Sequence, residues 1–184
     1  MYISIASLVG AYLLSQFYRT CLAVLTPVLG KEIGVTPGDL AVSLGLWYGA
    51  FALIQVPIGE ALDRIGPRRT VGVLMALGGG GGAAVFAMAQ GPMGIHLAMI
   101  LIGAGCAPVL VGSYFIFARS FKPALFGTLA ASMIGAGSLG NLAGAAPLAA
   151  SIEAFGWRPT LWALSALTLL VAALILWLAR DPER

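Results

Sequence analysis

The chain has 184 residues, of which 60% are hydrophobic and only 9% are charged, and its formal net charge is +3. The polar side chains are too few to cover the surface of a soluble globular protein of this size. The composition therefore indicates an integral membrane protein. The basic residues form no stripe with aromatic residues, which excludes nucleic acid as a partner. One histidine and seven acidic residues offer no nucleophile and base pair or metal cluster, so we expect neither an enzyme nor a bound cofactor.

Six apolar stretches are each long enough to cross a bilayer, which takes about 20 mainly apolar residues. They lie roughly at residues 3–29, 39–62, 70–89, 95–118, 126–150 and 159–179. These stretches occupy nearly the whole chain, so we predict a single all-α domain over residues 1–184, a bundle of six transmembrane helices in contact with membrane lipid. The first stretch has no basic segment before it and no small-residue cleavage site, so we interpret it as a retained helix and not as a signal peptide.

The first span carries four polar side chains on one face. Tyr12, Ser15, Arg19 and Thr26 are spaced so that a helix of 3.6 residues per turn brings them to the same side. Arg19 lies about 24 Å along this helix at 1.5 Å per residue, past the middle of a hydrocarbon core about 30 Å thick. A charge at that depth faces a cavity or a partner, or its long side chain extends towards the membrane surface. A planar cation beside hydroxyl groups suits a carboxylate or phosphate, so these four residues are the candidate binding site for an anionic solute.

The loop after the first span predicts where one helix ends and the next begins. Gly30 and Gly34 are expected to end the first helix. Thr36, Pro37 and Asp39 then supply an N-cap hydroxyl, a proline at the first helical position and an acid in the first turn, which together predict the start of the second helix.

Residues 59–70 form the most charged stretch of the chain and predict its orientation, because basic loops favour the cytoplasmic side. With spans that alternate in direction, seven basic residues fall on one side and only Lys31 and Arg158 on the other. The seven are Arg64, Arg68, Arg69, Arg119, Lys122, Arg180 and Arg184. We therefore expect both termini in the cytoplasm and the protein in the cell (inner) membrane.

Glycine is concentrated in the third span, where Gly78–Gly82 are consecutive. Such a run weakens a helix in water, but in lipid it allows neighbouring backbones to approach closely. We interpret this run as a packing surface. Met88, Met93, His96, Met99 and Cys106 offer soft side chains for Cu(I), which leaves copper import as a minor alternative, although methionine is also ordinary filler in apolar helices.

When the sequence is compared with itself at an offset of 90 residues, the two halves of the chain align, and Gly45 is paired with Gly135. The same shift pairs Pro57 with Pro147, Gly66 with Gly156, Arg68 with Arg158, Thr70 with Thr160 and Asp63 with Glu153. A duplication of three spans places the copies in opposite orientations, because three is odd. We therefore predict two inverted three-helix repeats, at about residues 1–90 and 91–184.

The turn G-x-x-x-D-R-x-G-x-R-R at residues 59–69 resembles the signature loop between transmembrane helices 2 and 3 of the major facilitator superfamily of secondary transporters. The resemblance implies half of a twelve-helix fold that works by alternating access. It also implies that five residues act as a conformational latch: Gly59, Asp63, Arg64, Gly66 and Arg68. The alternative is a solvated turn that only sets the topology of the chain.

Three positions within this turn depart from the family pattern: Ala61, Leu62 and Pro67. Many proton-coupled members carry an arginine four residues before a Gly-x-Gly in helix 4, and this chain has Met99 at that place. The glycine and proline pattern of the family's multidrug antiporters is also absent from helix 5. An arginine in helix 1 is similar to that of the family's organic-anion carriers, so the resemblance favours a small anionic solute contacted by Arg19.

One six-helix half has no opposite wall for a central cavity. A second half therefore comes from the same chain, from a homodimer or from a separate subunit. The favoured function is a secondary active transporter, or half of one, that moves a small anionic solute. The alternative is a membrane scaffold or assembly subunit that keeps the fold without transport.

Overall fold

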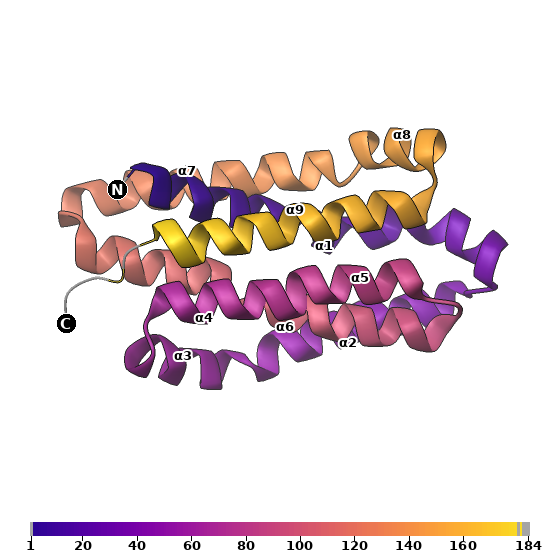
Figure 1. The fold of residues 1–184 in the computed structure, drawn as a ribbon, viewed down its shortest axis with the longest axis horizontal. Helices are drawn as coiled ribbons and strands as arrows, with labels where there is room; N and C mark the ends of the chain where they lie inside the picture. The colour runs from indigo at the N-terminus through magenta and orange to yellow at the C-terminus, as the bar shows by residue number, and fades with distance from the viewer. Residues whose placement is uncertain (1, 180, 182–184) are drawn as a thin grey trace.

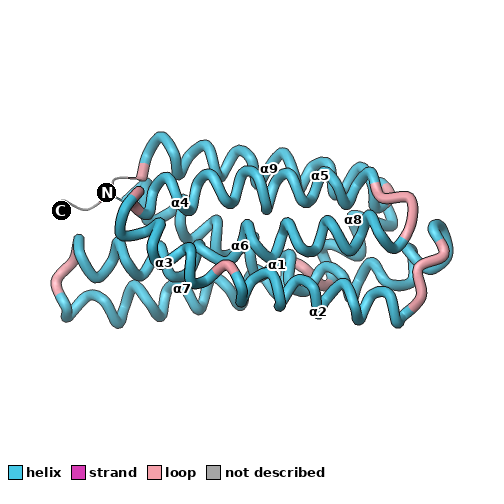
Figure 2. The backbone as a smooth tube through the Cα atoms, turned by 90° about the horizontal axis from the view of Figure 1, so that it is seen from below, coloured by secondary structure: helices cyan, strands magenta, loops and turns pink. Residues whose placement is uncertain are grey.

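The computed structural model describes residues 2–179 and 181, and long helices run side by side along its length (Figure 1). In chain order the elements are α1 (Tyr2–Ile33), α2 (Pro37–Leu53), α3 (Gln55–Arg64), α4 (Pro67–Leu74), the π-helix η1 (Met75–Gly80), α5 (Gly81–Met88), α6 (Pro92–Ser120), α7 (Pro123–Ala143), α8 (Ala146–Phe155) and α9 (Trp157–Leu178). The connections between spans lie at the two ends of the bundle (Figure 2).

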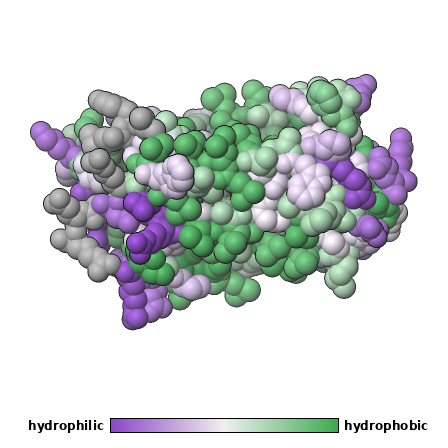
Figure 3. Space-filling view, viewed as in Figure 1, coloured by the Kyte–Doolittle hydropathy of each residue, from purple (hydrophilic) through white to green (hydrophobic). Residues whose placement is uncertain are grey.

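These elements join into six helices that are long and apolar enough to cross a membrane. Their bounds are Ser4–Ile33, Pro37–Arg64, Pro67–Met88, Pro92–Ser120, Pro123–Phe155 and Trp157–Leu178. The space-filling view shows an apolar band between polar ends (Figure 3). The prediction of an all-α membrane protein with six spans is therefore confirmed.

The first helix is longer than predicted, and this moves Arg19 relative to the membrane. α1 continues through Gly30 to Ile33 and ends at Gly34, whose φ of 67° is a left-handed conformation that glycine adopts without strain. The prediction that Gly30 helps to end the helix was therefore wrong. Because the span covers Ser4–Ile33, Arg19 lies near its middle and not beyond it.

The start of the second span matches its prediction. Thr36 caps α2, since the backbone N–H of Asp39 donates to the Thr36 hydroxyl oxygen at 3.2 Å and the Thr36 N–H donates to the Asp39 carboxylate at 2.9 Å. This reciprocal pair satisfies two backbone donors that the first helical turn leaves free. Pro37 occupies the first turn, where its missing N–H costs nothing.

Two spans break in the middle, and proline is the cause in both. Pro57 has no N–H to donate to the carbonyl of Leu53, and the second span breaks at Ile54 between α2 and α3. Pro147 has the same effect on the carbonyl of Ala143, and the fifth span breaks between α7 and α8.

The turns after these broken spans also share a local structure. Gly66 and Gly156 have φ angles of 101° and 86°, and each precedes the next helix. The hydroxyl of Thr70 donates to the carbonyl of Gly66 at 2.8 Å, and that of Thr160 to the carbonyl of Gly156 at 2.7 Å. The residues paired by the 90-residue shift therefore play matching local roles, while the inverted arrangement of the two repeats stays a prediction.

The glycines of the third span pack against neighbouring helices. A Cβ atom on Gly78 would lie 2.6 Å from the Cα of Gly105 on α6, and one on Gly82 would lie 2.7 Å from the Ile102 side chain. The hydroxyl of Ser165 on α9 donates to the Gly80 carbonyl, at the end of the π-helical turn, at 2.8 Å. Glycine here permits close helix contact, as predicted.

Burial differs strongly between the spans. In the most apolar stretch of each span, 50% of residues are buried in the first and 56% in the fourth, but only 17% in the second and 17% in the fifth. α2, α3, α7 and α8 therefore form the most exposed flanks of the bundle.

Candidate functional site

A cavity of about 120 Å³ lies at mid-height in the bundle, between α1, α2 and α6. Its lining residues are Tyr12, Ser15, Gln16 and Arg19 from α1, Trp47, Tyr48 and Phe51 from α2, and Cys106 and Leu110 from α6. Arg19 and Cys106 are both near the middle of their spans, Ser4–Ile33 and Pro92–Ser120. The cavity is therefore far from both membrane surfaces.

Arg19 is held against the aromatic side chains of the second span. Its Nε donates to the Tyr48 hydroxyl oxygen at 3.0 Å, and its guanidinium carbon lies 5.6 Å from the centre of the Tyr48 ring. Tyr48 packs edge-on against Trp47 with ring centres 4.8 Å apart. Among the described residues, Arg19 forms no ion pair with a carboxylate, and its side chain is exposed.

The structure brings three of the four predicted substrate residues together. Tyr12, Ser15 and Arg19 line the cavity, with Ser15 only 5% exposed. Thr26 lies two turns further along α1, outside the cavity lining, and its hydroxyl donates to the carbonyl of Leu22 at 3.0 Å. The role of these four residues in substrate binding stays a prediction.

Residues from two other spans complete the cavity wall. Trp47, which is 4% exposed, keeps its buried indole N–H without a hydrogen-bond partner among the described residues. Tyr48 is 44% exposed although it sits within an apolar span. In the sequence, Tyr48 is recognisable as a candidate because its hydroxyl lies within an apolar span. The sequence gives no reason to select Gln16 or Trp47, because the periodicity of a single helix does not show which residues of another helix it contacts.

The charged turn carries two ion pairs at the end of the bundle that we name the basic end, where α3 meets α4 and α6 meets α7. Arg64 pairs with Glu60 at 3.0 Å within α3. Asp63 lies 3.8 Å from Arg119 at the end of α6, and both side chains are at least half exposed. The Arg119 guanidinium also lies 4.1 Å from the centre of the Phe115 ring. Asp63 therefore connects the second span to the fourth.

The glycines of the turn have different surroundings. Gly66 needs its positive φ, and a Cβ there would lie 2.9 Å from the Asp181 carboxylate. That carboxylate accepts the backbone N–H of Arg68 at 2.7 Å. Gly59 faces open space, since nothing lies within 4 Å of the position of a Cβ. The described residues therefore make no close helix contact at Gly59, and the latch role of the five turn residues stays a prediction.

The soft side chains considered for copper have unlike environments. Met99 is fully buried, Met93 is 78% exposed and Met88 is 55% exposed. His96 Nδ1 lies 2.7 Å from the Ser43 hydroxyl oxygen and is engaged there. The described residues contain no group of three or more His, Cys, Asp or Glu side chains that could hold a metal ion.

Comparison with known proteins places this architecture in a family. Residues 8–184 match the Major Facilitator Superfamily. The chain is also similar to an uncharacterised transporter of Bacillus subtilis, YybO, with 25% identity over 175 residues, which cover 95% of this chain and 40% of that protein. The chain thus spans less than half the length of this relative. With six apolar spans and a family match over nearly all of its residues, the chain belongs to the Major Facilitator Superfamily.

Proposed function

We propose that this chain forms one half of a secondary active transporter that moves a small anionic solute by alternating access. The observation that carries the proposal is Arg19, a cation at mid-height in a transmembrane helix with no carboxylate partner among the described residues. A charge at this depth is costly, so such residues mark substrate or ion pathways. Membership of the family and similarity to a transporter support transport as the activity.

The chemistry of the cavity favours an anion. Arg19 uses its Nε on Tyr48, so its other guanidinium N–H groups stay free for a ligand in the part of the chain that the structure describes. The unpaired indole N–H of Trp47 adds a donor on the neighbouring helix. Unpaired N–H donors of this kind suit a carboxylate or phosphate ligand, because its oxygens accept several hydrogen bonds at once. Transporter sites lie near the bilayer midplane, which agrees with the height of this cavity.

The exposed flanks support a second six-helix half. The second and fifth spans bury few of their residues within this bundle. Tyr48 is exposed beside Arg19, so the candidate site is open on one side. A polar wall left against lipid is unfavourable, because hydrocarbon offers no hydrogen bonds. A second half, from the same polypeptide, a second copy or another subunit, would close the site.

We also propose that the basic end is cytoplasmic and that Asp63 acts there as a latch. The positive-inside rule supports the orientation, since five basic residues lie in or beside the turns at this end: Arg64, Arg68, Arg69, Arg119 and Lys122. Arg180 and Arg184 lie outside the described residues. The exposed 3.8 Å pair of Asp63 and Arg119 is weak enough to break during a conformational change.

Ligand-induced stabilisation of the protein tests the proposal. The probes are mono- and dicarboxylates and sugar phosphates, each compared with its neutral amide or alcohol. We expect at least one anion to raise the melting temperature in detergent and its neutral counterpart to have no effect, because binding to the folded state stabilises it. Arg19→Gln should abolish the shift.

Lys122→Gln is the control, because it removes a cation that lies outside the cavity and has no ion-pair partner among the described residues. Its anion response should equal that of the wild type. Stabilisation by neutral solutes alone, or an equal anion response in Arg19→Gln, would refute the anion assignment. If no solute shifts the melting temperature or is taken up by proteoliposomes, the non-transporting scaffold is the better description.

A further inference from the structure

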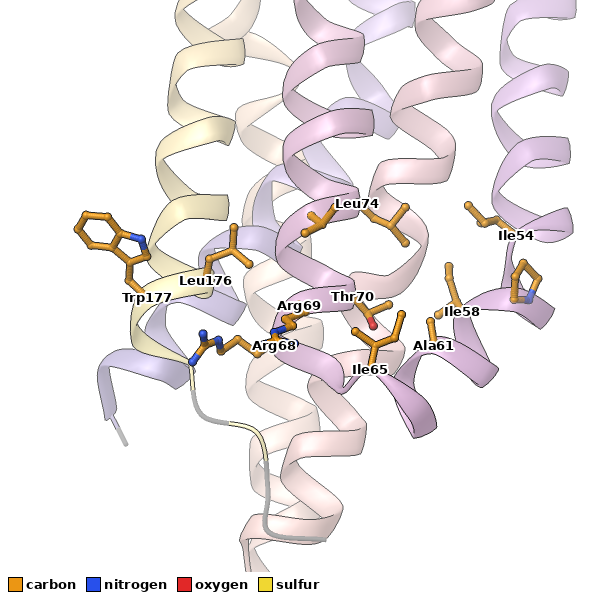
Figure 4. A pocket seen from close by; sticks show the side chains of 12 residues that line it. Ile54, Ile58, Ala61, Ile65, Arg68, Arg69, Thr70, Leu74, Leu176 and Trp177 are labelled. Carbon is orange, nitrogen blue, oxygen red and sulfur yellow. The ribbon is translucent and has the colours of Figure 1, made fainter.

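A second cavity lies outside the candidate substrate site. It has a volume of about 750 Å³, which is within the range of small-molecule pockets, and is lined by α3, α4 and α9 (Figure 4). Its apolar lining residues are Ile54, Pro57, Ile58, Ala61, Ile65, Val73, Leu74, Leu176 and Trp177, and the remaining three are Arg68, Arg69 and Thr70.

The break in the second span explains why this space exists. Pro57 interrupts the helix at Ile54, and Figure 4 shows α3 running obliquely away from α4 above the turn that joins them. α4 stays close to α9, where a Cβ on Gly72 would lie 2.6 Å from the Leu176 side chain. A groove therefore opens between α3 and α4, with α9 beside it.

The apolar part of the groove belongs to membrane-spanning helices. Ile54, Ile58 and Ala61 lie along one side in Figure 4, and Leu176 and Trp177 along the other. Trp177 is 85% exposed near the end of α9. Aromatic side chains at the end of a span are typical of the membrane interface, so the groove extends from the interface into the hydrocarbon region.

At the basic end of the groove, two arginine side chains have no hydrogen-bond acceptor among the described residues. Arg68 and Arg69 are adjacent at the start of α4, and no carboxylate is among the described residues that line the groove. The Nε of Arg68 is buried and has no hydrogen-bond partner among the described residues. Asp181 accepts the backbone N–H of Arg68, and it makes no hydrogen bond to the Arg68 guanidinium in the described part of the chain. A buried donor of a charged group without an acceptor is unfavourable, so the site favours an anion.

Arg158, the matching arginine in the other repeat, has hydrogen-bond acceptors for its guanidinium. Arg158 donates from Nη1 and Nη2 to the backbone carbonyls of Ala87 and Ala89 at 2.7 and 2.8 Å, and it stacks on Trp157. Arg68 has the corresponding position in the first turn, but among the described residues its side chain donates to no backbone carbonyl. The two turns have a similar backbone conformation, but the guanidinium of Arg68, beside the groove, has no hydrogen-bond acceptor among the described residues, whereas that of Arg158 does.

We propose that this groove binds an anionic phospholipid of the surrounding leaflet. The headgroup phosphate lies against Arg68 and Arg69, because a guanidinium binds phosphate oxygens in a bidentate manner. An acyl chain lies along the apolar wall between α3 and α4. The site is independent of the solute cavity and of the transport proposal, since Arg68 and Arg69 do not line that cavity.

Native mass spectrometry of the natural protein tests this site, with phosphatidylglycerol and phosphatidylcholine of identical acyl chains as probes. We expect phosphatidylglycerol to stay bound in preference to phosphatidylcholine. The double variant Arg68→Gln/Arg69→Gln should lower its affinity about tenfold or more, since each basic residue near the surface contributes to binding of anionic lipid. Arg119→Gln/Lys122→Gln removes two charges from the other turn at the same end and should leave the affinity unchanged.

A second variant addresses the apolar wall without altering charge. Ala61→Phe fills the groove and should reduce retention of phosphatidylglycerol even if the double arginine variant does not fold. Equal losses in the two double variants would overturn the proposal in favour of a general surface attraction. Displacement of the lipid by inorganic phosphate, or lipid binding unaffected by Ala61→Phe, would also overturn it, as would a groove filled by the second six-helix half.

Discussion

Arg19 on α1 donates a 3.0 Å hydrogen bond from Nε to the hydroxyl oxygen of Tyr48 on α2. This bond joins two spans that touch little elsewhere along their length, and it fixes the plane of the guanidinium at the cavity wall. Because Nε alone is used, the bidentate edge formed by the remaining N–H groups is available to a ligand within the described part of the chain. Tyr48 is therefore a positioning residue for Arg19.

Substitutions at these two residues separate charge from geometry. Arg19→Lys keeps the charge but loses the planar fork, so binding of the anion identified by the stabilisation screen should weaken by about tenfold or more. Tyr48→Phe removes only the neutral hydroxyl and should cost about two- to tenfold. Equilibrium binding with radiolabelled anion measures both.

Thr26→Val is the control for this pair, because Thr26 lies on α1 but outside the cavity lining. It should bind the anion like the wild type. Wild-type affinity in Arg19→Ala would make Arg19 a structural residue and remove the basis of the anion assignment. A large effect of Thr26→Val would instead return Thr26 to the site.

Asp63→Asn tests the latch, because it keeps size and hydrogen bonding but removes the charge that pairs with Arg119. The variant should insert normally and shift the balance between inward-open and outward-open states. Labelling of Gln16→Cys in the cavity from each side of the membrane reports that balance. Cys106 lines the same cavity, so the labelling uses a Cys106→Ala background, whereas Cys21 is buried and does not line the cavity.

Glu60→Gln is the matched control for the latch. It removes a carboxylate from the same turn, but one that pairs with Arg64 and not with Arg119. Its labelling pattern should match that of the wild type. An unchanged pattern in Asp63→Asn would leave this carboxylate with a role in topology alone.

We expect two copies of the bundle to associate through their exposed flanks. Expressed as these 184 residues, the chain should be paired in nanodiscs, as measured by mass corrected for bound lipid. Gly49→Trp on α2, where open space surrounds the glycine, should reduce pairing. Leu170→Trp, at a 56% exposed position on α9, should not. A stable monomer would contradict this prediction.

The glycine run of the third span allows a test of packing within one helix. Gly78→Ala places a methyl group 2.5 Å from the carbonyl oxygen of Leu101 and 2.6 Å from the Cα of Gly105, so the helices must separate. We expect a loss of about 1–3 kcal/mol in the free energy of unfolding, measured by titration with denaturing detergent.

Gly81→Ala, three residues further along, is the comparison for that loss. Its Cβ would lie 3.8 Å from the carbonyl oxygen of Ala76, which is ordinary van der Waals contact. Stability should therefore stay the same or rise slightly, because alanine is the better helix former. Equal destabilisation by both substitutions would show that helix propensity, and not close approach to α6, decides the effect.

Local features of the sequence determined the spans, the capped start of the second helix and the glycine packing surface. Hydropathy over about 20 residues is enough to recognise a span, since each helix satisfies its own backbone in lipid. The cap at Thr36 depends only on residues three apart. α1 ends later than predicted, because a glycine such as Gly30 is tolerated inside a transmembrane helix.

Which polar groups meet was decided only by the tertiary structure. Tyr12, Ser15 and Arg19 share a helix face that periodicity revealed, but their contact with Trp47 and Tyr48 depends on how α1 and α2 are rotated against each other. Arg68 and Arg158 occupy matching positions in sequence, yet within the described part of the chain only the Arg158 side chain reaches backbone carbonyls. The physical reason is that contacts between helices join residues far apart in the chain, whereas hydropathy, capping and periodicity are properties of one segment at a time.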